Sequence, residues 1–297
     1  MKLLVILFIL TSTDFDDPTR IANLEKLAAD NPDNWQARLE LVELFIRQSN
    51  LHNAEKYIQE AEESYASVVG DSCNARLRYL WGELLDHQDN IPAAMAKYIE
   101  AVECDPSLGR AWRKLGYLYE IFGNFDQMLD CFIKALPTTD DSSGLYYDIG
   151  VAYDNLDNLL PAIECYNKCL ALGSSTPEAY LNIGVDWGML GYQDSATFYF
   201  EKAAEAGLES PELFYNIGIM MLDSGANIEA LDNFMRTLAV DPNYSPAKLQ
   251  LGNIYEIIGD SGMARVYFDE FIKTAPLLYS DDIEAVKNKL DKHYSTK

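Results

Sequence analysis

Residues 177–210 read PEAYLNIGVDWGMLGYQDSATFYFEKAAEAGLES, and a stretch of this length returns in altered form along most of the chain. Its most regular feature is a glycine at the eighth position. That glycine recurs every 34 residues, at Gly82, Gly116, Gly150, Gly184, Gly218 and Gly252. A fixed period of 34 residues over 75–278 indicates a protein built from internal repeats, here six of them in one unbroken frame.

Other positions of the repeat agree with this frame, counted from position 1 at Ala75. Position 20 is alanine in every repeat but one. Position 24, one helical turn further on, is aromatic throughout, with Tyr98, Phe132, Tyr166, Phe200, Phe234 and Phe268. Apolar side chains at positions 4, 7, 8 and 11 and at 20, 24 and 27 have the spacing of helix faces. The repeat is therefore predicted to form two amphipathic helices, A and B, with glycine needed where alanine 20 of helix B crosses helix A closely.

Both helices also carry signals at their ends. A glycine that can take a positive φ follows helix A at position 15, in Gly123, Gly191, Gly225 and Gly259. A proline at position 32 ends helix B, in Pro106, Pro242 and Pro276. Together with the periodicity, these signals predict an all-α fold.

Two stretches, AWRKLGYLY (111–119) and ALDNFMRTLAVDP (230–242), resemble the tetratricopeptide repeat (TPR) family. The resemblance implies a right-handed α-solenoid of stacked helix-turn-helix repeats. It also implies a protein-protein interaction module that binds an extended peptide or a protein partner in a concave groove, as an adaptor, a chaperone-like protein or an assembly scaffold. Two alternatives stay open: a structural solenoid that associates with itself, and an accessory subunit of an exported or envelope-associated complex.

The flanks of the six repeats are less regular. Residues 18–74 are expected to hold one helix, a divergent repeat over 35–68 and an irregular turn, and residues 279–297 a C-terminal capping helix and tail. Residues 1–17 begin with MKLLVILFIL, a run too short to span a bilayer. This segment is either a signal or membrane anchor, or a degenerate helix of a further repeat.

The TPR resemblance places positions 2, 5, 6, 9, 12 and 13 of helix A in the groove. The partner-binding residues expected on this face are Tyr79, Arg113, Tyr117, Tyr147, Val151, Asn182, Val185, Tyr215, Asn216, Ile219, Gln250 and Asn253. The amides at position 6 resemble the asparagine ladder with which superhelical TPR proteins hold a peptide backbone. Exposed tyrosine also favours binding, because it offers a ring and a hydroxyl together. The alternatives are that part of the tyrosine row packs against the next helix A, and that asparagine is merely common at position 6.

The chain has a formal net charge of −24, which argues against nucleic acid as a partner. Either a basic partner or the solubility of a large surface would explain this charge. An acidic chaperone tail is not expected, because Arg113 and Lys114 stand among acidic residues such as Asp148. Association with a membrane and self-association are left open.

The five cysteines show no CxxC spacing, so neither a disulfide framework nor a zinc site is predicted, and Cys165 and Cys169 are expected to pack in the core. Their odd number slightly favours the cytoplasm. Residues 1–13 favour export or membrane attachment instead. The sequence contains no catalytic motif or phosphate loop, so we predict that the protein is not an enzyme and that it has no cofactor and no metal.

Overall fold

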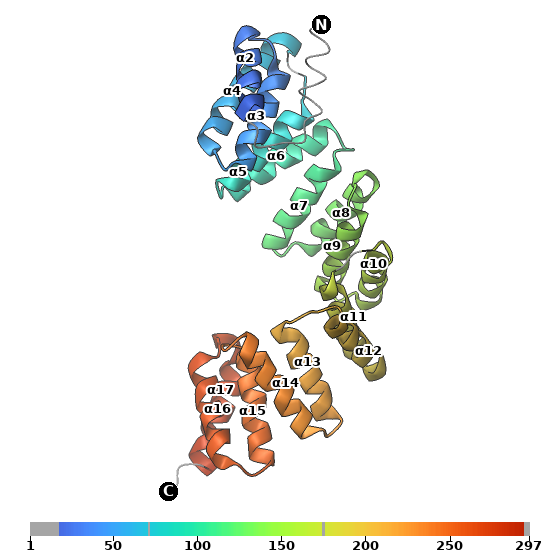
Figure 1. Ribbon diagram of the computed structural model, residues 1–297, viewed down its shortest axis with the longest axis vertical. Helices are drawn as coiled ribbons and strands as arrows, with labels where there is room; N and C mark the ends of the chain where they lie inside the picture. The colour runs from blue at the N-terminus through green and yellow to red at the C-terminus, as the bar shows by residue number, and fades with distance from the viewer. Residues whose placement is uncertain (1–17, 71, 174–175, 294–297) are drawn as a thin grey trace. The chain divides into compact units, whose positions relative to one another are not determined.

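The computed structural model describes residues 18–70, 72–173 and 176–293, and these are helical or lie in turns, with no strand among them (Figure 1). The predicted all-α class is therefore confirmed. The two interpretations of residues 1–17 concern a segment outside the described residues. None of the described helices is long and apolar enough to cross a membrane.

The chain forms two compact units, which meet in the sequence between Leu156 and Asp157. Unit 1 begins with the single helix α2 and continues with A and B helices in alternation. Its elements are α2 (Pro18–Asp30), α3 (Trp35–Arg47), α4 (Leu51–Val69), α5 (Ala75–His87), α6 (Ile91–Cys104), α7 (Gly109–Ile121), α8 (Phe125–Ala135), the short 3-10 helix η1 (Leu136–Thr138) and α9 (Ser142–Asn155). The helix and the divergent repeat expected before Ala75 are thus present.

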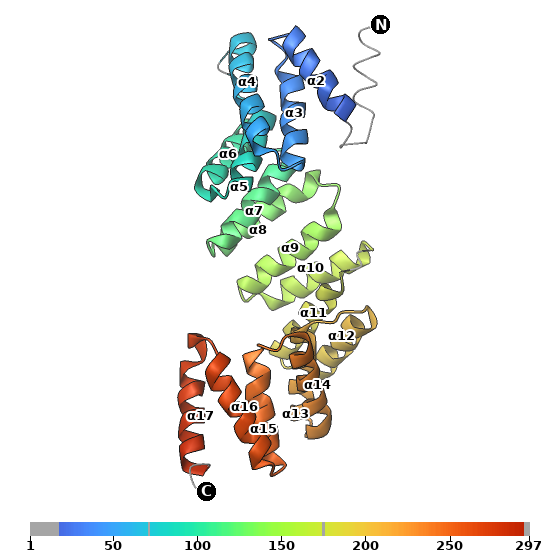
Figure 2. The same cartoon turned by 60° about the vertical axis from the view of Figure 1, so that its left-hand side comes forward.

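Unit 2 contains the remaining repeats and a last helix. Its elements are α10 (Leu159–Ala171), α11 (Pro177–Met189), α12 (Gln193–Glu205), α13 (Pro211–Asp223), α14 (Asn227–Val240), α15 (Ser245–Ile257), α16 (Ser261–Thr274), the 3-10 helix η2 (Leu277–Tyr279) and α17 (Ser280–His293). α17 runs alongside α16 in both cartoon views (Figure 2). Val286 of α17 is buried against Phe268 and Phe271 of α16, so α17 covers the apolar face of the last repeat.

The glycine at position 8 of helix A lies directly beneath the aromatic ring at position 24 of helix B. A Cβ atom added to Gly184 would be 2.6 Å from the ring of Phe200, and one added to Gly218 would be 2.7 Å from the ring of Phe234. These separations are too short for any real side chain, so the predicted requirement for glycine is confirmed. The nearest atoms belong to the aromatic ring, and at Gly184 the backbone carbonyl oxygen of Ala196, the alanine of position 20, would also lie 3.3 Å from the added Cβ.

The residue at position 15 has a positive φ in every repeat of the described chain. The glycines predicted at this position have a positive φ, which is +67° at Gly123 and +85° at Gly259. Ser49, Asp89 and Asp157 take the same conformation, with φ between +56° and +57°. The turn at these three repeats could not be predicted from a glycine, because serine or aspartate occupies the position.

The irregular turn before α5 is joined covalently to the end of α6. Cys73 and Cys104 form a disulfide, with their Cα atoms 5.6 Å apart. The prediction that no disulfide is present was therefore wrong, because it rested on short sequence spacings, whereas an antiparallel helix pair brings together residues 31 positions apart. Cys131, Cys165 and Cys169 are free and buried, as expected for core packing. With two of the five cysteines paired, the odd count no longer argues for a reducing compartment.

Candidate partner-binding face

Arg113 and Tyr117 of α7 lie in one hydrogen-bonded cluster with Asp148 of α9. Arg113 donates from Nε and Nη2 to Asp148 Oδ2 at 3.2 and 3.0 Å, and the Tyr117 hydroxyl donates to the same oxygen at 2.6 Å. Arg113 Nη1 donates to Asp141 at 3.1 Å. Burial raises the pKa of Asp148, and burial together with the bond to Asp148 raises the pKa of Tyr117 to about 12. All three nitrogens of this guanidinium thus already have partners inside unit 1.

Ion pairs of this kind connect each A helix of unit 1 to the next. Arg76 of α5 pairs with Glu43 of α3 at 2.8 Å, and Lys114 of α7 pairs with Asp86 of α5 at 3.5 Å. The Arg113 cluster makes the same connection from α7 to α9. Arg76, Lys114 and Arg113 are thus each paired with a carboxylate of a neighbouring A helix.

A pocket of about 250 Å³ opens on the A helices of the first three repeats of unit 1. Its lining comes from α3, the turn after it, α5 and α7, and comprises Glu43, Ile46, Arg47, Ser49, Tyr79, Glu83, His87 and Arg110. The guanidinium of Arg110 lies 4.6 Å from the centroid of the Tyr79 ring, and the Tyr79 hydroxyl donates to Glu83 at 2.7 Å. Tyr79 is only 6% exposed, so the expectation of an exposed tyrosine was wrong at this position. The ring forms a wall of the pocket and packs against the next A helix.

Tyr147 and Val151, the remaining expected residues of unit 1, lie on α9 and are half-buried. They do not line the pocket between α3, α5 and α7. Their part in binding stays a prediction.

In unit 2, most of the expected amides have internal partners. Asn182 Nδ2 donates to the hydroxyl of Tyr166 at 3.1 Å, and Gln250 is hydrogen-bonded to Tyr215. Asn253 Oδ1 accepts from Lys289 of α17 at 3.4 Å. The asparagine row is thus partly a set of structural contacts, and Asn182 supports a buried tyrosine that belongs to a packing column.

Asn216 differs from these amides. Its side chain is half-buried on α13 and makes no hydrogen bond to any part of the chain that the structure describes. Val185 of α11 and Ile219 of α13, two expected apolar groove residues, are half-buried as well. The ring of Tyr215 packs against Phe234 and Tyr244, with centroids 5.5 and 5.3 Å away. This part of the face combines one open amide with partly exposed apolar groups, and the exposed carboxylate of Glu212 lies one helical turn before Asn216 on α13.

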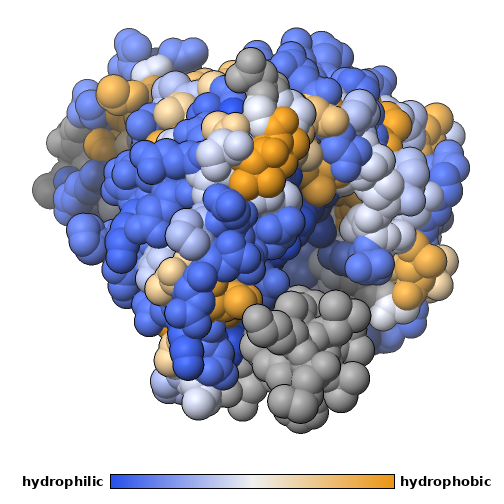
Figure 3. All heavy atoms as spheres, turned by 90° about the horizontal axis from the view of Figure 1, so that it is seen from above, coloured by the Kyte–Doolittle hydropathy of each residue, from blue (hydrophilic) through white to orange (hydrophobic). Residues whose placement is uncertain are grey.

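No cluster of three or more histidine, cysteine or acidic side chains suited to a metal ion is present in the described ranges. Hydrophilic side chains cover most of the surface seen in Figure 3, and hydrophobic ones form small separate groups.

Family models of the tetratricopeptide repeat match the chain over residues 21–69 and 143–172. The chain contains tetratricopeptide repeats. The first match covers α2, α3 and α4, so the divergent first repeat belongs to the same TPR array as the six regular ones.

Solved TPR structures share the fold of this chain. PilW, a type IV pilus biogenesis factor, is 19% identical with a TM-score of 0.60, over 71% of this chain and 97% of PilW. A TPR protein from Parabacteroides merdae is 16% identical with a TM-score of 0.59, over 87% and 98%. The TPR protein YrrB is 22% identical with a TM-score of 0.52, over 61% and 93%. At these identities the similarity shows the fold alone. No significant match was found among curated protein sequences.

Several residues that line the pocket were not predicted from the sequence, although they occupy groove positions of the TPR repeat. Glu43, Ile46 and Arg47 occupy positions 9, 12 and 13 of the divergent repeat, all of which are groove positions. His87 occupies position 13 and Arg110 position 2 of the following repeats. We had expected binding residues almost entirely from Arg113 onward. Applying the same columns to the repeat from Trp35 would have found Glu43, Ile46 and Arg47.

Proposed function

We propose that the chain is a non-catalytic protein-binding module that holds an extended segment of a partner on the face formed by its A helices. The segment lies across Val185, Asn216 and Ile219 of unit 2, and the pocket between α3, α5 and α7 of unit 1 is a separate site for a side chain. The observation that carries the proposal is Asn216, because its half-buried amide makes no hydrogen bond within the described chain and is therefore available to a bound segment.

The chemistry of Asn216 suits a peptide backbone. One amide side chain can donate to a backbone carbonyl and accept from a backbone N–H at the same time. Val185 and Ile219 offer apolar contact to the side chains of the same segment. Such contacts tolerate many sequences, which agrees with a scaffold or adaptor. One of the fold's neighbours, YrrB, is described as a TPR protein with an unusual peptide-binding site.

A basic partner fits the net charge of −24, which acts mainly on the partner's approach, whereas the Asn216 amide is itself uncharged. We therefore expect salt to slow association of a basic segment and to leave the contribution of Asn216 unchanged.

The test uses peptides selected on the full chain from a random phage-displayed library. Asn216→Ala should weaken the selected peptide about 2- to 10-fold, since a hydrogen bond contributes about 0.5–1.5 kcal/mol. Asn233→Ala is the matched control: Asn233 lies on helix B of the same repeat, and its Nδ2 donates to the Glu229 carbonyl. Equal affinity of both variants and of the unaltered chain at low and high salt would place recognition elsewhere.

Self-association is the second candidate function. Leu277 and Leu278 of η2 are 91% and 86% exposed beside the last helix. Exposed leucines of this kind favour contact with another apolar surface. If the chain associates through them, Leu277→Ser with Leu278→Ser should lower the mass measured by light scattering toward that of a monomer. A monomeric unaltered chain at high concentration would exclude this function.

A further inference from the structure

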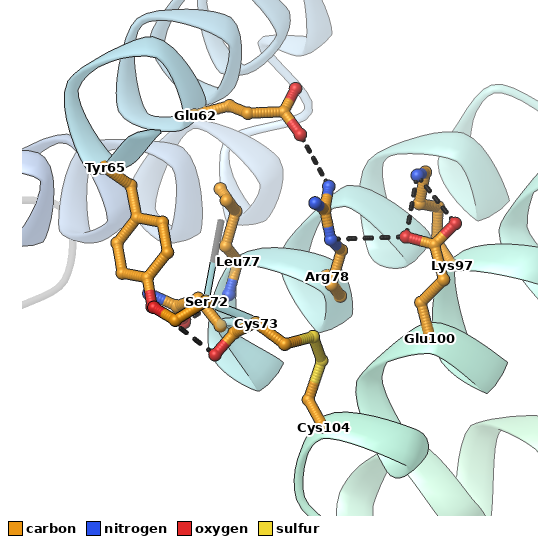
Figure 4. Close-up of a disulfide and its surroundings, with 10 residues drawn as sticks. Glu62, Tyr65, Ser72, Cys73, Leu77, Arg78, Lys97, Glu100 and Cys104 are labelled. Carbon is orange, nitrogen blue, oxygen red and sulfur yellow. Dashed lines mark hydrogen bonds and ion pairs between the residues drawn. A yellow bond between two sulfur atoms is a disulfide. The ribbon is translucent and has the colours of Figure 1, made fainter. Parts of the chain in front are cut away.

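The disulfide joins the start of α5 to the end of α6, at the end of this helix pair that lies opposite the connecting turn. Cys73 lies two residues before α5, and Cys104 is the last residue of α6 (Figure 4). The other end of the same pair is closed by the short turn between His87 and Ile91. The start of α5 and the end of α6 therefore cannot separate while the bond is intact.

Two walls of the unit 1 pocket begin at these tied ends. Tyr79 lies in the second turn of α5, and Arg110 is the second residue of α7, six positions after Cys104. The contact between them, 4.6 Å from guanidinium to ring centroid, joins α7 to α5 across the pocket. The disulfide thus fixes the spacing of the two segments that bring Arg110 over Tyr79.

The disulfide is accessible to a reductant in solution. Cys73 is exposed and Cys104 half-buried, whereas Cys131, Cys165 and Cys169 are buried. A dithiol reductant can attack one sulfur with its thiolate, form a mixed disulfide and release the other cysteine as a thiolate, which takes up a proton. The second thiol of the reductant then displaces the remaining cysteine and closes the reductant's own disulfide. Two electrons pass to the protein, and the buried cysteines are shielded from exchange.

Contacts that do not involve sulfur hold the surrounding helices together. Arg78 of α5 pairs through Nη1 with Glu62 of α4 at 2.6 Å and through Nε with Glu100 of α6 at 3.2 Å (Figure 4). The hydroxyls of Tyr65 and Ser72 lie within 2.8 Å of each other. Reduction therefore loosens the ends of the hairpin without removing the ion pairs that tie α4, α5 and α6.

We propose that the Cys73–Cys104 disulfide is a redox-controlled lock on the pocket between α3, α5 and α7. In the oxidised chain the bond holds Arg110 over Tyr79. In the reduced chain the turn between α6 and α7 moves away from the start of α5, and the pocket loses this wall. The inference rests on the proposed function only in taking the pocket as part of the binding face.

Hydrogen exchange of the full chain, without any partner, tests the lock directly. Reduction with dithiothreitol should speed amide exchange about tenfold in residues 75–80 and 105–113, because the constraint on these segments is removed. Exchange in α13 and α14 should stay the same. A chain carrying Cys73→Ser with Cys104→Ser should exchange like the reduced protein and should not respond to dithiothreitol.

Three results would overturn the proposal. The bond could resist dithiothreitol in the folded chain, which alkylation and mass measurement report. Faster exchange could be confined to residues 70–74, or it could extend equally through unit 2. If the double variant does not fold, the reduced unaltered chain decides alone. Because no partner is present, a failure to bind any peptide would refute the proposed function and leave this result standing.

Discussion

At the scale of single residues, the repeat depends on glycines that lie beneath aromatic rings. At Gly184 an added Cβ would be 2.6 Å from the Phe200 ring and 3.3 Å from the Ala196 carbonyl oxygen. Phe200 is itself only 4% exposed, so its ring has little room to move aside. The glycine is required by packing, since its own conformation is helical and suits any residue.

A glycine on the same helix provides a matched pair of substitutions. Gly184→Ala should lower the free energy of unfolding by about 1–3 kcal/mol through overpacking. Gly188→Ala should be neutral or should raise it by up to about 1 kcal/mol, because alanine favours helix and the nearest atom to a new Cβ is 3.8 Å away. Urea unfolding measures both. Equal stability of the two variants would show that the ring does not press on Gly184.

Three partly buried tyrosines make stability depend on alkaline pH. Burial, with Glu25 the next cause, raises the pKa of Tyr57 to about 12; burial also raises the pKa of Tyr117 and Tyr244 to about 12. In the unfolded chain a tyrosine ionises near pH 10. The unfolded state therefore loses these protons first, and stability should be constant below about pH 10 and fall between about pH 10 and 12.

Urea melts across this range measure the slope. Tyr117→Phe should make it shallower, whereas Tyr192→Phe, at a site 58% exposed, serves as the control. A slope that Tyr117→Phe leaves unchanged would mean that the Tyr117 hydroxyl titrates alike in both states.

At the scale of helices, α17 occupies the place that helix A of a further repeat would take. Val286 stands at position 8 of that frame, where every regular repeat has glycine. A valine there leaves no space for the aromatic ring of a following helix B. On its inner side α17 covers Phe268 and Phe271 of α16.

Val286→Asp should therefore destabilise unit 2 strongly, by about 2–4 kcal/mol, because it buries a charge against the last repeat. Val266→Asp on α16 is the control, since Val266 is 47% exposed and Val286 only 4%. Thermal unfolding compares the two. Similar melting temperatures would show that α17 does not cover the last repeat.

The helices could be predicted well from the sequence because the same local signals occur in each repeat. The glycine at position 8, the aromatic at position 24 and the glycine at position 15 act over one or two helices. The Cys73–Cys104 disulfide and the unit 1 pocket depend on segments about 30 or more residues apart, in or next to the divergent repeat, where the glycine of position 8 is Val42. Likewise, the bond from Asn182 to Tyr166 joins two repeats, so a column of asparagines alone could not show which amides are already bound.

At the scale of the whole molecule, the two units present different binding chemistry. On the A-helix face of unit 1, ion pairs connect successive A helices, and a pocket lies beside Tyr79. The face of unit 2 carries the amide of Asn216 with the apolar side chains of Val185 and Ile219, and Glu212 lies one helical turn before Asn216. A segment bound on unit 2 should therefore be held mainly by hydrogen bonds and apolar contacts, while the net charge of −24 acts on the approach of the partner.

The most direct measurement of the central claim locates the bound segment. A photo-crosslinking amino acid replaces Ile219 on helix A of one repeat or, as the control, Ile228 on helix B of the same repeat, which is 80% exposed. With a library-selected peptide, we expect crosslinking from position 219 at low and high salt and none from position 228. Crosslinking from position 228 alone, or equally from both, would contradict binding on the A-helix face.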